Sequence, residues 1–169
     1  MSSIFHYTTR TNLASILAIG FIKPASAGVP SDEVPAVWLS AAEKWEQTAS
    51  KGIIVDGKRR TATLKEMIKI DRYVARIEID PSRVEIISKS DFKSLLKMSA
   101  ATYNFLVKGG QAMGARPFEW SAVAGSIPST AFIRIETAGT AAPIKWIDVG
   151  WKRREALNQS GEFLIDARS

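Results

Sequence analysis

The chain has 169 residues, 46% of them hydrophobic and 24% charged, which suits one globular domain and argues against global disorder. The lack of cysteine and the presence of a single histidine exclude disulfides, thiolate nucleophiles and zinc sites built from several such ligands. The formal net charge of +6 favours polyanionic ligands such as dinucleotides, DNA or RNA, although a solubilising surface would explain an excess of this size equally well.

The first quarter of the chain predicts three short strands and two helices. Residues 4–8 form the first strand, which carries the only histidine among bulky and β-branched neighbours. A helix over 12–20 follows, with apolar residues at helical spacing and a glycine to end it. Residues 21–23 and 36–40 predict further strands on either side of a loop rich in proline, glycine and serine, and 41–48 predict a second helix.

The middle of the chain combines one clear strand with two helices. Residues 51–63 (Lys51 to Thr63) are a polar, glycine-bearing excursion that we expect to be mobile. Over 72–80, apolar and polar residues alternate with the period of two that is typical of a half-buried strand. Helices are predicted over 91–98, with a serine cap, and over 100–107, where two glycines at 109–110 break the second one.

Three further strands are predicted near the C-terminus, over 118–123, 131–137 and 144–149. Strands outnumber helices and do not alternate regularly with them, which indicates an α+β fold and not a doubly wound one. We therefore expect one domain over 1–150 and a C-terminal tail over 151–169 that is basic at its start. No secretory signal pattern and no apolar run long enough to cross a bilayer is found, so we expect a cytoplasmic protein.

One acidic residue stands out as a candidate for catalysis. Glu119 opens a predicted strand, lies between Phe118 and Trp120, and follows a proline that restricts the approach of the chain. Burying a carboxylate without a partner is costly, so such a residue is often held in place for a reaction. Arg116 offers the alternative, a structural salt bridge with Glu119. Phosphate-binding glycine loops, dinucleotide fingerprints and serine nucleophile elbows are not found in the sequence.

Three segments together resemble the motifs of the ADP-ribosyltransferase fold, and most closely those of bacterial DNA-targeting ADP-ribosyltransferase toxins. His6-Tyr7-Thr8 resembles the first motif, a histidine followed by any residue and then Thr or Ser on a strand. Trp38-Leu39-Ser40 resembles the second, an aromatic residue two places before a serine. Phe118-Glu119-Trp120 resembles the third, in which the catalytic glutamate begins a strand. The resemblance implies two packed, twisted, mostly antiparallel sheets with flanking helices and a cleft for NAD.

The resemblance also implies roles for individual residues in a glycosyltransferase reaction, mono-ADP-ribosyl transfer from NAD to a macromolecular acceptor. Glu119 would be the catalytic residue that stabilises the cation formed as nicotinamide leaves. His6 would hydrogen-bond a ribose hydroxyl of NAD, and Ser40 would orient the nicotinamide amide or the glutamate. The further NAD-binding residues that it implies are Tyr7, Thr8, Arg10, Trp38 and Tyr73. The implied reaction uses no metal.

The chain departs from this family pattern in two places. The toxins carry an arginine near the second motif, where this chain has Ala41-Ala42-Glu43-Lys44, so Arg10 or Lys44 would serve the phosphates of NAD. Many protein-modifying relatives place an acid or a glutamine two residues before the catalytic glutamate, where this chain has Pro117. This departure and the positive charge favour a nucleic-acid acceptor, DNA or RNA, over an arginine side chain. The setting implied is a bacterial toxin or a defence protein.

Two other functions stay open. One is a relative of the NAD-dependent RNA 2′-phosphotransferases, which share the fold and depend on paired arginines, for which Arg10, Arg76 and Arg116 are the candidates. The other is a non-catalytic domain of the same fold that binds nucleic acid or a partner protein. Such a domain would bind DNA or RNA with a steep salt dependence and would not bind NAD.

The candidate residues also have purely structural explanations. His6 could bond a backbone carbonyl, Trp38 could pack in the core, and Ser40 could cap a helix that begins at residue 41. We assign Glu136 to the exposed surface of a strand. The aromatic residues that we assign to packing are Trp45, Tyr103, Phe105 and Trp146.

Overall fold

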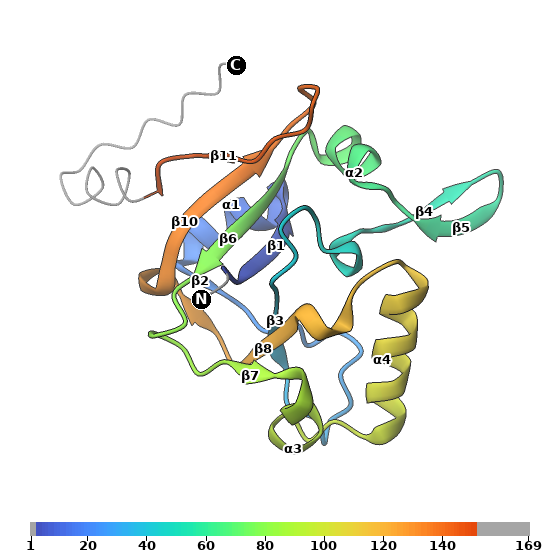
Figure 1. Ribbon diagram of the computed structural model, residues 1–169, viewed down its shortest axis with the longest axis vertical. Coiled ribbons are helices and arrows are strands. Elements are labelled where there is room, and N and C mark those ends of the chain that lie inside the picture. Colours follow the sequence, from blue (N-terminus) through green and yellow to red (C-terminus); the bar gives the residue numbers. More distant parts are fainter. Residues whose placement is uncertain (1–2, 152–169) are drawn as a thin grey trace.

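Seven strands form the main sheet of the computed structural model, which describes residues 3–151 (Figure 1). In chain order they are β1 (Phe5–Thr9), β3 (Ala36–Ser40), β6 (Val74–Ile79), β7 (Ile87–Ser88), β8 (Trp120–Ala124), β10 (Phe132–Ala138) and β11 (Ile147–Asp148). They lie in the order β11-β10-β6-β1-β3-β8-β7, and every neighbouring pair is antiparallel. Apart from its first residue, the expected tail lies outside the described residues, and so does its basic cluster at 152–154.

Within residues 3–151, two strand pairs and the α-helices α1 to α4 accompany this sheet. β2 (Phe21–Ile22) pairs with β9 (Ile127–Pro128), and β4 (Gly52–Val55) pairs with β5 (Lys58–Thr61). The α-helices are α1 (Arg10–Ile19), α2 (Leu64–Asp71), α3 (Phe92–Leu95) and α4 (Ala100–Ala112). Single 3-10 turns occur at η1 (Gln47–Ala49), η2 (Lys89–Asp91), η3 (Pro117–Glu119) and η4 (Ser129–Ala131). Within residues 3–151, no helix combines the length and the apolar character needed to cross a membrane.

The main sheet has a narrow joint between β1 and β3. These two strands pair through a single couple, Phe5 with Ser40, whereas β1 and β6 pair over five residues and so do β3 and β8. Figure 1 shows β10, β6 and β1 in the upper half of the view and β3, β8 and β7 in the lower half. The α+β class and the antiparallel pairing are confirmed. The expected two separate sheets are instead two halves of one sheet that share this joint.

The first helix is confirmed and ends at the predicted glycine, but it begins at Arg10, two residues before its predicted start, because Thr9 caps it. The hydroxyl of Thr9 accepts a hydrogen bond from the N–H of Asn12, and Gly20 ends the helix with a φ of 77°. Leu13 and Ile16 are buried on the face of α1 that packs against the sheet. The strand at 36–40 is also confirmed with its predicted bounds.

Residues 41–48 do not form the predicted helix. Within them the N–H of Ala42 donates to the hydroxyl of Ser40, and the N–H of Thr48 donates to the carboxylate of Glu46. The Ala42 bond is compatible with a helix cap, but Glu46 takes up the N–H of Thr48, and side chains from elsewhere bind the carbonyls of residues 42–44, so these groups cannot form helical hydrogen bonds. The segment is therefore an irregular loop between β3 and β4.

The excursion at 51–63 contains a β-hairpin, β4–β5, which the sequence reading did not predict. Asp56 and Gly57 close it with φ angles of 50° and 73°, the left-handed conformations that a two-residue hairpin turn requires. The hairpin projects from the rest of the protein at the right of Figure 1.

The glycines at 109–110 do not break the helix that contains them. α4 continues through both glycines. Gly110 lies directly against the Trp120 ring, and its lack of a side chain leaves room for that ring. A Cβ atom on Gly110 would lie 2.2 Å from that ring, so the small residue serves packing between α4 and β8. Phe105, assigned to the core, is 81% exposed on the same helix.

The central strand β6 is buried on both faces and is not half-buried as its alternation predicts. Its two charged residues are buried as ion pairs with β10: Arg76 with Glu136 at 2.7 Å, and Glu78 with Arg134 at 2.5 Å. Glu136 is therefore a buried partner of Arg76 and not the surface acid expected. Charge pairing across the sheet explains how polar residues of an alternating pattern become buried.

Three expected elements are shorter than predicted. The helix at 91–98 reduces to α3, and Lys97 beyond it adopts a φ of 53°, which a helix cannot continue through. The strand at 118–123 begins only at Trp120, because Pro117 starts a 3-10 turn. The strand at 144–149 reduces to the two residues of β11.

Candidate functional site

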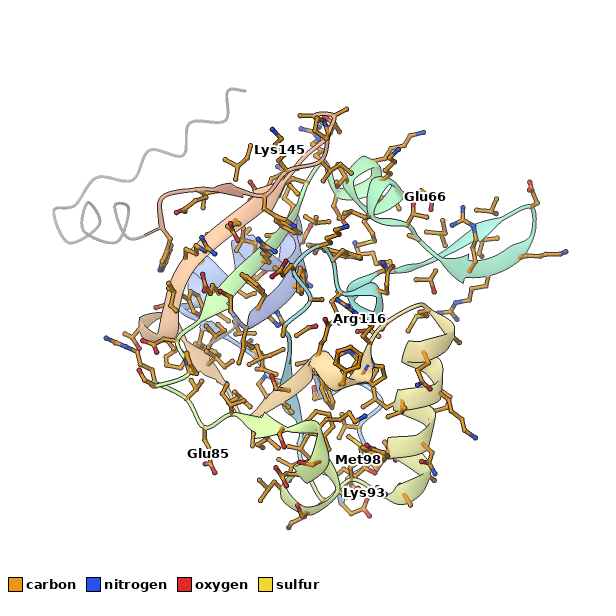
Figure 2. The ribbon with its side chains drawn as sticks, in the orientation of Figure 1. Glu66, Glu85, Lys93, Met98, Arg116 and Lys145 are labelled. Carbon is orange, nitrogen blue, oxygen red and sulfur yellow. The ribbon has the colours of Figure 1, made fainter. Side chains whose placement is uncertain are left out.

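A cleft of about 620 Å³ lies where β3 ends and β8 begins. One wall is the irregular loop over residues 41–47, and the other is formed by residues 114–116 and Glu119. Its size is within the range of about 300–1,000 Å³ that is usual for small-molecule sites. Arg116, labelled in Figure 2, lies at this cleft beside η3.

Glu119 is the predicted catalytic residue that lines the cleft directly. Its backbone carbonyl accepts a hydrogen bond of 2.9 Å from the N–H of Ala41, so it lies one step beyond the Ser40–Trp120 pair of β3 and β8. Its side chain is 13% exposed and forms a two-point ion pair with Arg116, at 2.5 Å to Nη2 and 3.0 Å to Nε. Arg116 itself is 60% exposed, so this partner can swing away from the carboxylate.

Ser40 contacts a second carboxylate, Glu46, which sequence reasoning did not single out. The Ser40 hydroxyl donates to Oε2 of Glu46 at 2.8 Å, and the indole N–H of Trp120 donates to the same oxygen at 3.1 Å. Oε1 accepts from the N–H and the hydroxyl of Thr48, at 3.1 and 2.8 Å. Four neutral donors thus satisfy a buried carboxylate at the cleft. The available sequence signal was an acid two residues before a threonine, a spacing that lets a carboxylate cap a turn.

The loop wall of the cleft is held from behind by three side chains. The Tyr7 hydroxyl donates to the carbonyl of Ala42, the Arg76 guanidinium to that of Glu43, and the Trp146 indole to that of Lys44 at 2.9 Å. Arg76 lies between the rings of Phe5 and Trp146, 4.2 and 4.5 Å from their centroids. Three consecutive carbonyls are therefore bound by groups from β1, β6 and the segment before β11.

These three hydrogen bonds also determine the direction in which the N–H groups of this loop point. The peptide bonds over 42–45 are trans, so each N–H points opposite to the carbonyl of its own peptide. The N–H groups of Glu43, Lys44 and Trp45 consequently face away from Tyr7, Arg76 and Trp146, and none of them donates a hydrogen bond within residues 3–151. Unpaired backbone N–H groups are hydrogen-bond donors of the kind that bind anions.

His6 connects the two halves of the sheet at their joint. Its Nδ1 lies 3.1 Å from the carbonyl of Trp38, and because a carbonyl only accepts, Nδ1 carries the proton and Nε2 is left as an acceptor. Burial lowers the pKa of His6 below its ordinary value, and the hydrogen bond to Trp38 opposes that effect, so the ring is neutral near pH 7. This contact fits the structural explanation, and a role toward NAD stays a prediction.

The other predicted NAD-binding residues divide into two groups. Tyr7 and Ser40 support the walls of the cleft without lining it. Tyr7 packs edge-on against Trp45 at 5.4 Å, and its burial raises the pKa of its phenol to about 12, an effect that Arg76 opposes. Neither do the remaining residues line the cleft: Thr8 is buried in β1, Trp38 packs on Phe92 at 5.3 Å, and Arg10 lies 5.9 Å from the ring centroid of Tyr73.

The described part of the chain contains no cluster of three or more acidic or histidine side chains that could hold a metal ion. Trp45 and Trp146 stack at 6.4 Å behind the loop wall, as expected of packing residues. Comparisons of the chain with protein-family models, with curated proteins and with solved structures found no match.

Proposed function

We propose that the chain is an NAD-dependent mono-ADP-ribosyltransferase that uses the cleft beside Glu119 and acts on a macromolecular acceptor. The observation that carries the proposal is that one cleft is lined both by a carboxylate and by a loop whose N–H groups at residues 43–45 donate no hydrogen bond within residues 3–151. NAD needs both, because it carries an anionic pyrophosphate and a ribose that becomes cationic when nicotinamide leaves.

The loop wall supports the anionic half of this substrate. The N–H groups of Glu43, Lys44 and Trp45 would bind phosphate oxygens, and the exposed side chain of Lys44 adds a positive charge beside them. Arg116 lines the opposite wall and would supply a second cation once it leaves Glu119. This assigns the phosphates to Lys44 and Arg116, and not to Arg10, which does not line the cleft.

Glu119 supports the proposed reaction at the ribose–nicotinamide bond of NAD. In ADP-ribosyl transfer the bond between the ribose carbon and the nicotinamide nitrogen breaks, and its electron pair leaves with nicotinamide. A nucleophile of the acceptor then bonds that carbon and gives up a proton. A carboxylate in a partly enclosed cleft stabilises the positive charge that develops between these events, because little water screens it.

The two alternative functions require different features of the structure. Paired arginines of the 2′-phosphotransferase kind lack support, because Arg76 is buried against Glu136, Arg116 is paired with Glu119, and Arg10 lies over Tyr73. A non-catalytic domain would keep the tethered loop but would neither bind nor consume NAD.

The test is nicotinamide release and self-modification by the purified chain with NAD, comparing the wild type with Glu119→Gln. We expect the variant to lose about 10²–10³-fold in turnover while still binding NAD in calorimetry, because the amide keeps the shape and loses the charge. The matched control is Glu85→Gln, an exposed carboxylate away from the cleft (Figure 2), which should leave turnover unchanged. Equal turnover by Glu119→Gln and wild type would refute the proposal, and no heat of binding with NAD would favour the non-catalytic domain.

A further inference from the structure

The projecting β4–β5 hairpin and the helix after it carry most of the excess charge of the chain. Residues 51–72 contain seven lysines and arginines and three carboxylates, a net charge of +4 compared with +6 for the whole chain. Two of the three carboxylates are already paired at the base of the hairpin, Glu66 with Arg60 and Asp71 with Lys51. The five other cations are exposed and form no ion pair within residues 3–151: Lys58, Arg59, Lys65, Lys69 and Arg72.

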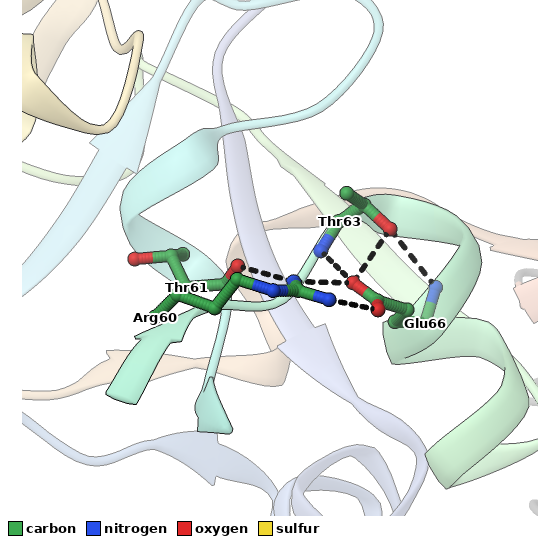
Figure 3. A network of polar contacts seen from close by, with 4 residues as sticks. All are labelled: Arg60, Thr61, Thr63 and Glu66. Atoms are coloured by element: carbon green, nitrogen blue, oxygen red, sulfur yellow. Dashed lines mark hydrogen bonds and ion pairs between the residues drawn. The ribbon is translucent and has the colours of Figure 1, made fainter. Parts of the chain in front are cut away.

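The base of the hairpin is fastened to α2. Figure 3 shows Arg60 donating to both oxygens of Glu66, at 2.8 and 2.5 Å, while Glu66 also accepts from the N–H and the hydroxyl of Thr63. Directly before β4, Lys51 donates to both oxygens of Asp71 at 3.1 and 3.0 Å. The hairpin therefore projects as a supported two-stranded ribbon, although its tip touches little else (Figure 1).

The two faces of this ribbon differ. Residues directly opposite each other on paired strands point to the same face, so Ile53 and Arg60 share the face that is fastened to the protein. Ile54 and Arg59 share the other face, where Ile54 is 75% exposed. Lys58 pairs with Val55 beside the turn, so it points to the same face as Arg60, at the exposed tip of the ribbon. The Arg59 side chain lies across the ribbon over Gly52, where a Cβ atom would be 3.0 Å from its Nε.

We infer that the outer face and tip of the β4–β5 hairpin dock in the major groove of duplex DNA. That groove is about 12 Å wide and admits a two-stranded ribbon, whereas the major groove of duplex RNA is too narrow for side chains to read. Single strands are bound by stacking on aromatic residues, and residues 51–63 contain none. Arg59 on the outer face and Lys58 at the tip would contact phosphates, and the exposed Ile54 would contact thymine methyl groups.

The inference does not depend on the proposed enzymatic activity, because it concerns binding in the absence of NAD. It is tested by fluorescence anisotropy of a short labelled duplex with the whole chain, over about 50–200 mM salt. The double variant Lys58→Gln/Arg59→Gln should bind more weakly, and its plot of log K against log salt should be less steep by about 2, since each phosphate contact contributes about 0.9.

The matched control is Lys23→Gln/Lys93→Gln, which removes the same charge from exposed lysines outside the hairpin region. Lys93 lies on α3, far from the hairpin (Figure 2). The control should keep the wild-type slope, and both variants should keep the wild-type thermal transition. Equal loss of slope in the two variants would overturn the inference, because diffuse net charge would then explain binding. Absence of duplex binding, or tighter binding of single-stranded DNA or of duplex RNA with the same sequence, would overturn it as well.

Discussion

The hydroxyl of Ser40 donates a 2.8 Å hydrogen bond to Oε2 of Glu46, and this contact joins the end of β3 to the loop wall of the cleft. The family resemblance implied that Ser40 orients the nicotinamide amide or Glu119. In the structure, Ser40 holds Glu46 in place together with Trp120. Glu46 is thereby a support for the cleft that the motif comparison did not reveal.

Glu46→Gln should destabilise the fold. Trp120 can only donate through its indole, so an amide that turns its NH₂ group toward Trp120 and Ser40 leaves a buried donor unpaired. We expect a loss of about 1–3 kcal/mol in the free energy of unfolding, measured by urea denaturation. Glu85→Gln makes the same chemical change at an exposed position and should change stability little. Equal stability of the two variants would show that the Glu46 network contributes nothing.

Two neighbouring glycines of α4 should respond in opposite directions to alanine. Gly110→Ala places a methyl group 2.2 Å from the Trp120 ring and should cost about 1–3 kcal/mol through overpacking. Gly109 has nothing within 4 Å of the same position, so Gly109→Ala should stabilise by about 0.5–1 kcal/mol through helix propensity. Thermal unfolding of both variants tests the pair. The packing of α4 on Trp120 would be contradicted if both substitutions were stabilising.

Glu66 should make stability fall in acid. Hydrogen bonds from Arg60, followed by those from Thr63, hold the pKa of Glu66 at about 2, compared with an ordinary value of 4.5. A lowered folded-state pKa stabilises the fold above pH 4.5, and this contribution disappears as the pH falls from 4.5 to about 2. Glu66→Gln should flatten the curve of unfolding free energy against pH in that window. If the unfolding free energy of the variant fell as steeply in acid as that of the wild type, other carboxylates would account for the loss of stability.

Tyr7 should produce the opposite effect in alkali. Burial raises the pKa of its phenol to about 12 from an ordinary 10, so the unfolded chain loses the proton first. Stability should therefore fall between pH 10 and 12, and Tyr7→Phe should reduce that fall. At neutral pH the same variant leaves the Ala42 carbonyl without its donor and should cost about 1–3 kcal/mol. In an ultraviolet pH titration, the tyrosine ionisation at the highest pH should be missing from Tyr7→Phe. If that ionisation remained, the raised pKa would not belong to Tyr7.

Local signals in the sequence predicted most of the regular elements. The strand at 36–40 and the capped helix α1 follow from short-range periodicity and from end signals that act within a few residues. The helix predicted at 41–48 was wrong because Glu46 binds the N–H of Thr48 and because distant side chains bind the carbonyls of residues 42–44. Gly110 was misread because its partner, Trp120, is ten positions away and on a different element.

The candidate site was predictable in part. Glu119 was found because a proline and two aromatic residues mark it locally, and it does line the cleft. The loop wall could not be found, because its carbonyls are bound by Tyr7, Arg76 and Trp146, which are 33 to 102 residues away in the sequence. Contacts between residues so far apart produce no periodic pattern that a single sequence would show.

The three tethered carbonyls limit how this loop can be transferred or redesigned. Residues 42–44 contain no regular secondary structure, and their shape depends on three anchors contributed by separate parts of the chain. Grafting 41–47 onto another scaffold would move the residues without their conformation. Conversely, substitutions at the exposed side chains of the segment should keep its backbone conformation, so the chemistry of this cleft wall could be changed while the three anchors stay constant.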